Sequence, residues 1–242
     1  MWDWLTLPLA IDRPHVLTDA QQWHARLMFV AWGVIAPLAV IIARYFKVLP
    51  QQDWPRQLDS QFWWRIHWIG QSLVLVFTML AVYLLYRQGL DSTTIHSRIG
   101  YVVLALVAFQ IALGYFRGSK GGPTAPLANG DISGDHYDMS LRRRVFEVLH
   151  KSLGYCLLLL SVASIVMGLW HVNAPRWMWI CILSWWILLI GLFIVLQRKG
   201  FAIDTYQAIW GPDPRHPGNS APAPGWGMRR MENKATVGRG GD

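Results

Sequence analysis

The stretch IHSRIGYVVLALVAFQIALGYFR (Ile95 to Arg117) is an apolar run of helical length with one histidine near its start. A second apolar run repeats its pattern, because both read H-x-x-[IL]-G-Y-x12-G from their histidines, His96 and His150. In each copy both glycines lie on the helix face of the histidine, the second one after five turns. They are Gly100 and Gly114 in the first copy, and Gly154 and Gly168 in the second. A large flat group could therefore lie against each helix beside the imidazole.

The composition around these two runs is that of a membrane protein. Hydrophobic residues make up 53% of the 242 residues and charged residues only 15%, whereas about a quarter of a soluble domain is charged. Five apolar runs each have about the 20 residues that cross ~30 Å of hydrocarbon. The other three runs are residues 23–43, 62–86 and 177–197. The sequence therefore predicts an all-α membrane protein with five transmembrane helices, the first four forming an up-down bundle.

Polar segments divide the chain into three parts. We expect a short outer tail at 1–22 without the positively charged start of a removable signal peptide, and a transmembrane domain at 23–197. Residues 198–242 are rich in Pro, Gly, Asn and Arg, which predicts a disordered tail. The connection at 118–141 is too polar to enter a bilayer. Either Asp138 or Ser140 is expected to cap the fourth long helix.

Basic residues predict the orientation of the chain. Five of the 22 Lys and Arg residues fall in the N-terminal tail and the second and fourth connections, and the other 17 fall on the opposite side. The positive-inside rule then places the N-terminus outside and the C-terminus in the cytoplasm. The net charge of +8 thus reflects membrane topology, which removes nucleic acid as a partner. We assign the run Arg142 to Arg144 to topology and lipid contact.

Four histidines begin four successive spans. Because the spans alternate in direction, His24 and His96 lie at the outer level, and His67 and His150 lie at the cytoplasmic level. The first and third helices of such a bundle are diagonal, as are the second and fourth. Two facing imidazoles are what bis-histidine ligation of a haem iron requires. A single histidine could be an interfacial residue rather than a ligand. Zinc is the competing metal, but it would need about four converging ligands, whereas these histidines converge in pairs.

Small and basic residues accompany these histidines. Gly70, like Gly100 and Gly154, would let a porphyrin approach the backbone, and Gly114 and Gly168 would lie near the level of the opposite haem. A cation within two residues of each histidine could neutralise a haem propionate, with interfacial snorkelling as the alternative. These cations are Arg26, Arg65, Arg98 and Lys151. His171, beyond the fourth run, is a reserve ligand.

Three motifs resemble those of the cytochrome b561 family of transmembrane electron carriers. They are H-x-x-L-M-x-V-A-W-G from His24 to Gly33, H-x-R-x-G…Q-x-x-x-G-x-x-R from His96 to Arg117, and H-x-x-x-G at His150 and Gly154. The resemblance covers residues 23 to about 197 and is closest to a five-helix, bacterial-type core. It implies two b-type haems, iron protoporphyrins held by the two histidine pairs, that relay electrons across a membrane.

The sequence therefore predicts transmembrane electron transfer between a small-molecule or protein donor on one side and an acceptor on the other. We expect an electron carrier rather than an enzyme with catalytic side chains, in a bacterial inner membrane. The alternatives are a haem-carrying anchor subunit of a larger redox complex, or a transporter or structural membrane protein without a cofactor. Besides the lipid bilayer, a homodimer or a redox-complex partner is compatible with the sequence.

Overall fold

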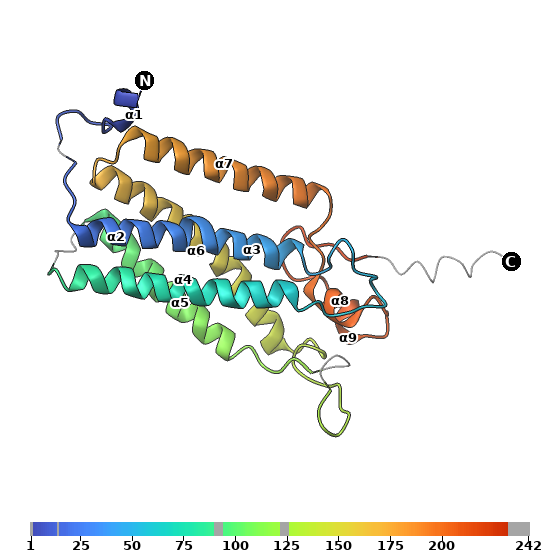
Figure 1. Cartoon of the computed structure of the whole chain (residues 1–242). Helices are drawn as coiled ribbons and strands as arrows, with labels where there is room; N and C mark the ends of the chain where they lie inside the picture. Colours follow the sequence, from blue (N-terminus) through green and yellow to red (C-terminus); the bar gives the residue numbers. More distant parts are fainter. Residues whose placement is uncertain (1, 14, 90–93, 122–125, 232–242) are drawn as a thin grey trace. The chain divides into compact units, whose positions relative to one another are not determined.

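The structure, a computed structural model, describes residues 2–13, 15–89, 94–121 and 126–231 (Figure 1). In these residues the regular structure is helical, apart from two isolated β-bridges. The elements are α1 (Trp2–Thr6), α2 (Asp19–Met28), the π-helix η1 (Phe29–Ile35), α3 (Ala36–Tyr45), α4 (Phe62–Tyr86), α5 (Ile95–Tyr115), α6 (Leu141–His171), α7 (Arg176–Arg198), α8 (Thr205–Trp210) and α9 (Pro217–Ser220).

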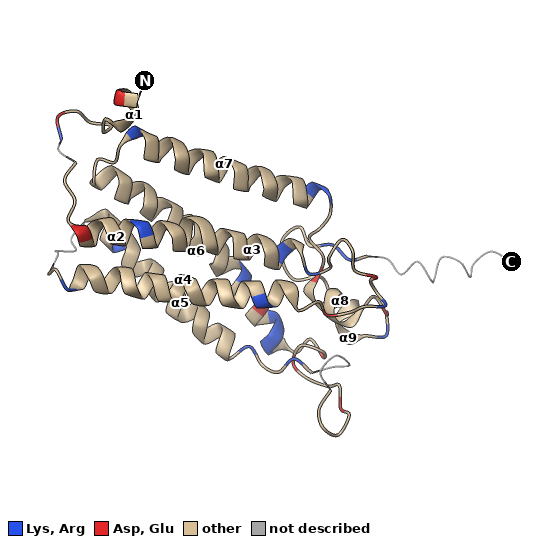
Figure 2. Cartoon of the chain, viewed as in Figure 1, with Lys and Arg blue, Asp and Glu red and all other residues tan. Residues whose placement is uncertain are grey.

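Five helices are long and apolar enough to cross a membrane, which confirms the predicted all-α membrane fold. The first is the continuous helix Asp19–Tyr45, made of α2, η1 and α3. The others are α4, α5, α6 and α7, and α4 has the predicted bounds. Along α7, Lys and Arg occur only at the two ends, as a membrane span requires (Figure 2). The chain is an integral membrane protein.

The helix α6 is longer than a bilayer needs. Its 31 residues extend over about 46 Å at a rise of ~1.5 Å each, compared with ~30 Å of hydrocarbon. The Ser140 hydroxyl accepts a hydrogen bond from the backbone N–H of Arg143 at 3.3 Å, so Ser140 is the cap of the two predicted residues. The polar connection before it therefore ends immediately before the helix begins.

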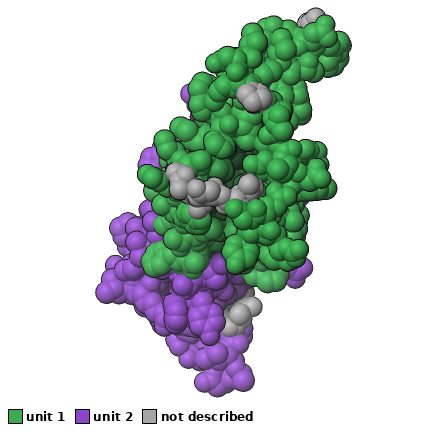
Figure 3. Space-filling view, turned by 90° about the vertical axis from the view of Figure 1, so that its left-hand side faces the viewer, with its two compact units in different colours: residues 1–40, 67–109, 154–194 green, residues 41–66, 110–153, 195–242 purple. Residues whose placement is uncertain are grey.

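The chain divides into two compact units (Figure 3). Unit 1 comprises residues 1–40, 67–109 and 154–194, and unit 2 comprises residues 41–66, 110–153 and 195–242. Each of the five long helices contributes a segment to both units.

Unit 1 has an apolar core. One side of it is formed by the first long helix, with Ala31, Trp32 and Ala36, and single residues of α4, α5 and α6 complete it. The indole N–H of Trp32 donates to the Thr78 hydroxyl at 3.0 Å, and both side chains are buried. The hydrogen bond satisfies two polar groups that would otherwise be costly to bury.

Unit 2 includes an ordered C-terminal segment, residues 199–231, which differs from the disordered tail expected from residue 198. All six residues of α8 are buried. Its aromatic residues Tyr206 and Trp210 form a core cluster with Met139 and Ile209. These large side chains supply the burial that the Pro- and Gly-rich composition does not predict. Residues 232–242 of the expected tail lie outside the described residues.

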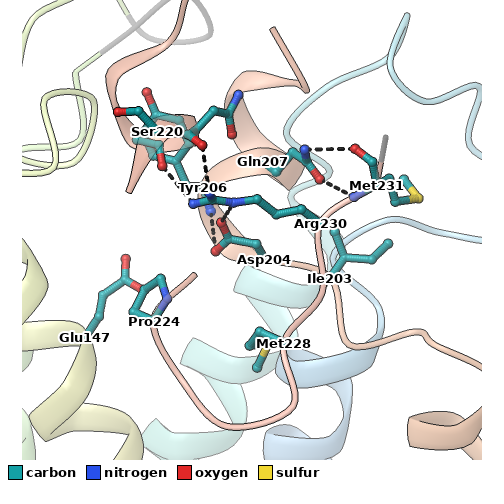
Figure 4. A network of polar contacts seen from close by, with 12 residues as sticks. Glu147, Ile203, Asp204, Tyr206, Gln207, Ser220, Pro224, Met228, Arg230 and Met231 are labelled. Carbon is teal, nitrogen blue, oxygen red and sulfur yellow. Dashed lines mark hydrogen bonds and ion pairs between the residues drawn. The ribbon is translucent and has the colours of Figure 1, made fainter. Parts of the chain in front are cut away.

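Polar contacts hold this C-terminal segment together (Figure 4). The Arg230 Nε donates to the buried Asp204 Oδ2 at 3.0 Å, and its two terminal nitrogens donate to the backbone oxygens of Gly218 and Asn219 at 2.7 Å each. The Gln207 side chain exchanges two hydrogen bonds with the backbone of Met231, at 2.7 and 3.0 Å. The guanidinium of Arg230 therefore joins three parts of the segment.

Candidate functional site

The structure brings the predicted pair His24 and His96 together within unit 1. His24 lies on α2 and His96 on α5, and their ring centroids are 6.0 Å apart with an angle of 86° between the ring planes. Two imidazoles on opposite sides of one metal ion have centroids roughly 6 Å apart, because each metal–nitrogen bond is about 2 Å long and each ring adds its radius. The spacing of the two rings therefore fits a shared metal ion.

Hydrogen bonds orient both rings of this pair. The Nδ1 atom of His24 lies 3.3 Å from the Ala81 backbone oxygen, and the Nδ1 atom of His96 lies 2.9 Å from that of Ser164. A carbonyl oxygen only accepts hydrogen bonds, so these contacts assign the proton of each ring to Nδ1. The Nε2 atoms then carry lone pairs, which is the tautomer a metal-ligating histidine adopts.

Glycines of the repeated motif differ in how closely other parts of the chain approach them. A Cβ atom at Gly168 would lie 3.1 Å from His96 Cε1 and 3.2 Å from its Nδ1, so α6 needs a glycine here to admit the ring. No described atom lies within 4 Å of a Cβ placed at Gly100 or Gly114. The helix surface is therefore open at both positions, and the contact of these glycines with a haem stays a prediction.

Gly70 has a helix-packing contact that its sequence position did not indicate. A Cβ atom at Gly70 would lie only 2.9 Å from the Cβ of Ala39, so this glycine lets α4 approach α3 closely. Helix packing explains Gly70 without a haem. Gly154 is half-buried on α6.

The second predicted pair is divided between the units. His67 lies on α4 in unit 1 and His150 on α6 in unit 2, and both are half-buried. The ring of His150 stacks on Phe146 at a centroid distance of 5.1 Å, and its backbone oxygen accepts a hydrogen bond from Gln110 Nε2 at 3.0 Å. Gln110 of the second motif thus connects α5 to α6 at His150. The pairing of His67 with His150 stays a prediction.

The four cations near the histidines have different surroundings. Arg26 is exposed and lies over the Trp23 ring at 5.2 Å, which fits the interfacial alternative. Arg65 and Arg98 are exposed. Lys151 donates to Glu147 Oε2 at 2.7 Å and to the Pro224 backbone oxygen at 2.8 Å. Arg26 and Lys151 therefore have protein contacts with which a haem propionate would have to compete.

A buried charge cluster in unit 2 was missed from the sequence. Glu147 is 3% exposed, and its carboxylate lies 3.1 Å from Arg143 Nε and 2.7 Å from Lys151 Nζ. His136 Nε2 lies 3.6 Å from Glu147, and burial lowers the pKa of His136 to about 3, so its ring is neutral at pH 7. Arg143, Glu147 and Lys151 follow each other at four-residue intervals, which places them on one helix face and was the available signal.

The comparison with known proteins agrees with the histidine motifs. Residues 23–119 match the model of the family described as eukaryotic cytochrome b561. This chain is a relative of the cytochrome b561 proteins. The match supports a b-type haem cofactor in this chain.

Several curated relatives of the cytochrome b561 type are longer than this chain. Ferric-chelate reductase 1 of Bos taurus is 26% identical over 197 residues, which are 78% of this chain and 30% of that protein. The Homo sapiens protein of the same name is 26% identical over 198 residues, with the same coverage. A cytochrome b561, DM13 and DOMON domain-containing protein of Arabidopsis thaliana is 24% identical over 152 residues, 62% of this chain and 14% of that protein.

The chain thus spans less than a third of the length of these relatives. No solved structure matches it. The relatives named here are eukaryotic, so the bacterial inner membrane stays an expectation from the sequence.

Proposed function

We propose that this chain is a transmembrane electron carrier with two b-type haems, one held by His24 and His96 and the other by His67 and His150. The observation that carries the proposal is the facing pair in unit 1, whose rings lie 6.0 Å apart with both Nδ1 atoms directed at carbonyl oxygens. A bound haem would supply a one-electron couple between its two iron oxidation states.

The residues of the pair have defined tasks in this proposal. The Nε2 atoms of His24 and His96 would hold the haem iron, and the Nδ1 hydrogen bonds hold the rings in place and raise their basicity. Gly168 leaves the space into which the His96 ring fits. The apolar core around Trp32 excludes water, and burial together with hydrogen bonding to the ligands sets the potential of such a site.

Contacts at His150 and the distribution of cations support the second site and the orientation of the chain. Gln110 fixes the backbone of α6 at His150, and Phe146 stacks on the His150 ring. Seventeen of the 22 Lys and Arg residues fall in the first and third connections and the C-terminal tail, which the positive-inside rule would place on the cytoplasmic side, with the N-terminus outside. Electrons would then pass between the outer side and the cytoplasmic side of the membrane.

The names of the relatives suggest one acceptor. Two of them are ferric-chelate reductases, so we propose a ferric chelate as the acceptor class to test first. The competing function is a haem-carrying anchor of a larger redox complex, which the greater length of the relatives favours. Electron transfer across liposomes that contain only this chain would support the carrier, and activity only with an added partner would support the anchor.

Haem analysis of purified protein tests the proposal directly. We expect two haems per chain and paired b-type bands after reduction. His96→Ala should remove one haem, because it deletes a ligand of one pair, while His171→Ala, an exposed histidine past the motif, should keep both. A haem content that His96→Ala leaves unchanged would refute the assignment of this pair.

A further inference from the structure

The three consecutive arginines at the start of α6 point in different directions. Arg143 is buried, with its Nε 3.1 Å from Glu147, whereas Arg142 and Arg144 are exposed. Successive residues of an α-helix are about 100° apart, so with Arg143 directed inward the other two lie on opposite flanks of the helix. The basic run therefore presents two separate cations to the surroundings and not one patch of three.

An apolar groove lies beside each exposed arginine. The first groove has a volume of about 370 Å³ and is lined by Leu141, Arg144, Val145, Val148 and Leu149. The second has a volume of about 500 Å³ and is lined by Leu113, Phe116, Leu141, Arg142, Val145 and Phe146. Leu141 and Val145 line both grooves and form the ridge between them. Each groove is apolar except for one guanidinium, and among the described residues no carboxylate lines either of them.

The helix length places these grooves at the edge of the bilayer. The 31 residues of α6 exceed the hydrocarbon thickness by about ten residues. Its charged residues lie at its start, so the excess length belongs to the first turns, at the level where headgroups meet acyl chains. Leu141 and Val148 are nevertheless 69% and 52% exposed there. Such an apolar surface beside a cation matches a ligand that has a hydrocarbon chain and an anionic head.

The charge of the two arginines is only partly compensated by the protein. Arg142 donates to the Phe116 backbone oxygen at 2.8 Å and lies 3.9 Å from Asp135. Among the residues that the structure describes, Arg144 makes no ion pair. Basic side chains beside a membrane span attract anionic headgroups.

We propose that the start of α6 binds one acidic phospholipid of the surrounding bilayer. Its two acyl chains would occupy the two grooves on either side of the Leu141–Val145 ridge, and its phosphate would lie beside Arg144, the arginine that makes no ion pair with the described residues. This site is independent of the haem ligands and requires no electron transfer.

Native mass spectrometry of the purified full chain tests the site with phosphatidylglycerol and phosphatidylcholine of equal chain length. The wild-type chain should retain phosphatidylglycerol preferentially. Arg144→Gln should weaken that retention about fivefold, the contribution of one cation at a membrane surface. Arg56→Gln, an exposed arginine of the 46–61 connection, should leave it unchanged. Equal retention of both lipids, as expected if the grooves dock a protein partner, or no effect of Arg144→Gln would overturn the proposal.

A second variant tests the grooves separately from the cation. Val148→Asp places a carboxylate on the exposed rim of the first groove and should lower the retention of both lipids. Millimolar inorganic phosphate should not displace bound phosphatidylglycerol, because the acyl chains contribute to binding. Complete displacement by phosphate would assign the arginines to a free anion, and undiminished binding to Val148→Asp would exclude the groove.

Discussion

The same five long helices build both compact units, yet different chemistry stabilises each unit. Unit 1 contains five Lys and Arg residues and four Asp and Glu residues. Unit 2 contains 17 Lys and Arg residues and 10 Asp and Glu residues. The core of unit 1 is apolar, with the Trp32–Thr78 hydrogen bond inside it. Unit 2 buries charged groups themselves, namely Arg44, Lys47, Arg143, Glu147 and Asp204. The stability of unit 2 therefore depends on charge compensation, and that of unit 1 on packing.

Backbone oxygens of the C-terminal segment supply much of this compensation. Lys47 donates to the Ile203 oxygen at 2.9 Å, Lys151 to the Pro224 oxygen at 2.8 Å, and Arg44 to the Trp226 oxygen at 2.7 Å. Removing one partner of a buried charge costs more than the intact interaction contributes, because the remaining charge stays desolvated. The predictions below test whether the two units differ in this way.

The largest effect is expected for Glu147→Ala in unit 2. The substitution leaves Arg143 and Lys151 without their carboxylate, and it should lower the free energy of unfolding by about 3–5 kcal/mol. Thermal or denaturant unfolding of the detergent-solubilised protein measures the change.

The matched control is Asp53→Ala, which breaks the exposed pair with Arg56 and should cost less than about 1 kcal/mol. If both substitutions had similar effects, the charges of unit 2 would not be the basis of its stability.

A packing change in unit 1 should have an intermediate effect. Gly168→Ala places a Cβ atom 3.1 Å from the His96 ring and should destabilise the fold by about 1–3 kcal/mol while altering the absorption spectrum of bound haem. Gly191→Ala, a glycine of α7 outside the histidine motifs, meets open space and should change neither property. If both substitutions changed the absorption spectrum equally, the effect of Gly168→Ala would not come from its contact with the His96 ring.

The smallest effect, a pH dependence of about 1.4 kcal/mol for each pH unit, should again originate in unit 2. Burial, with a contribution from Arg143, lowers the pKa of His136 from 6.5 to about 3. Below pH 6.5 the unfolded chain binds a proton at His136 that the folded chain does not bind. Stability should therefore fall as the pH decreases from 6.5 toward 3, by up to about 1.4 kcal/mol per pH unit.

Unfolding curves at several pH values between 7 and 5 measure this slope. His136→Gln should show a shallower slope over the same range. An identical slope in both proteins would mean that other groups cause the pH dependence.

The predictable features are those encoded by neighbouring residues. The run 62–86 became α4 with the same bounds, because the length of an apolar segment and the hydrophobic thickness alone decide a span. The pairing of His24 with His96 followed from the alternation of spans, and the structure brings them together. The choice of Ser140 over Asp138 as a helix cap required the structure, since both residue types can accept a backbone N–H.

The sequence by itself determined five membrane-crossing helices, their order and the facing histidines of unit 1, since these follow from hydropathy, length and reversal of direction at each crossing. Tertiary structure decided the rest. It gave Gly70 a packing role, ordered residues 199–231 and buried Glu147 with its cations. A charge or a glycine acquires its role from partners far away in the chain, such as Ile203 for Lys47 and Pro224 for Lys151, and no local pattern specifies those contacts.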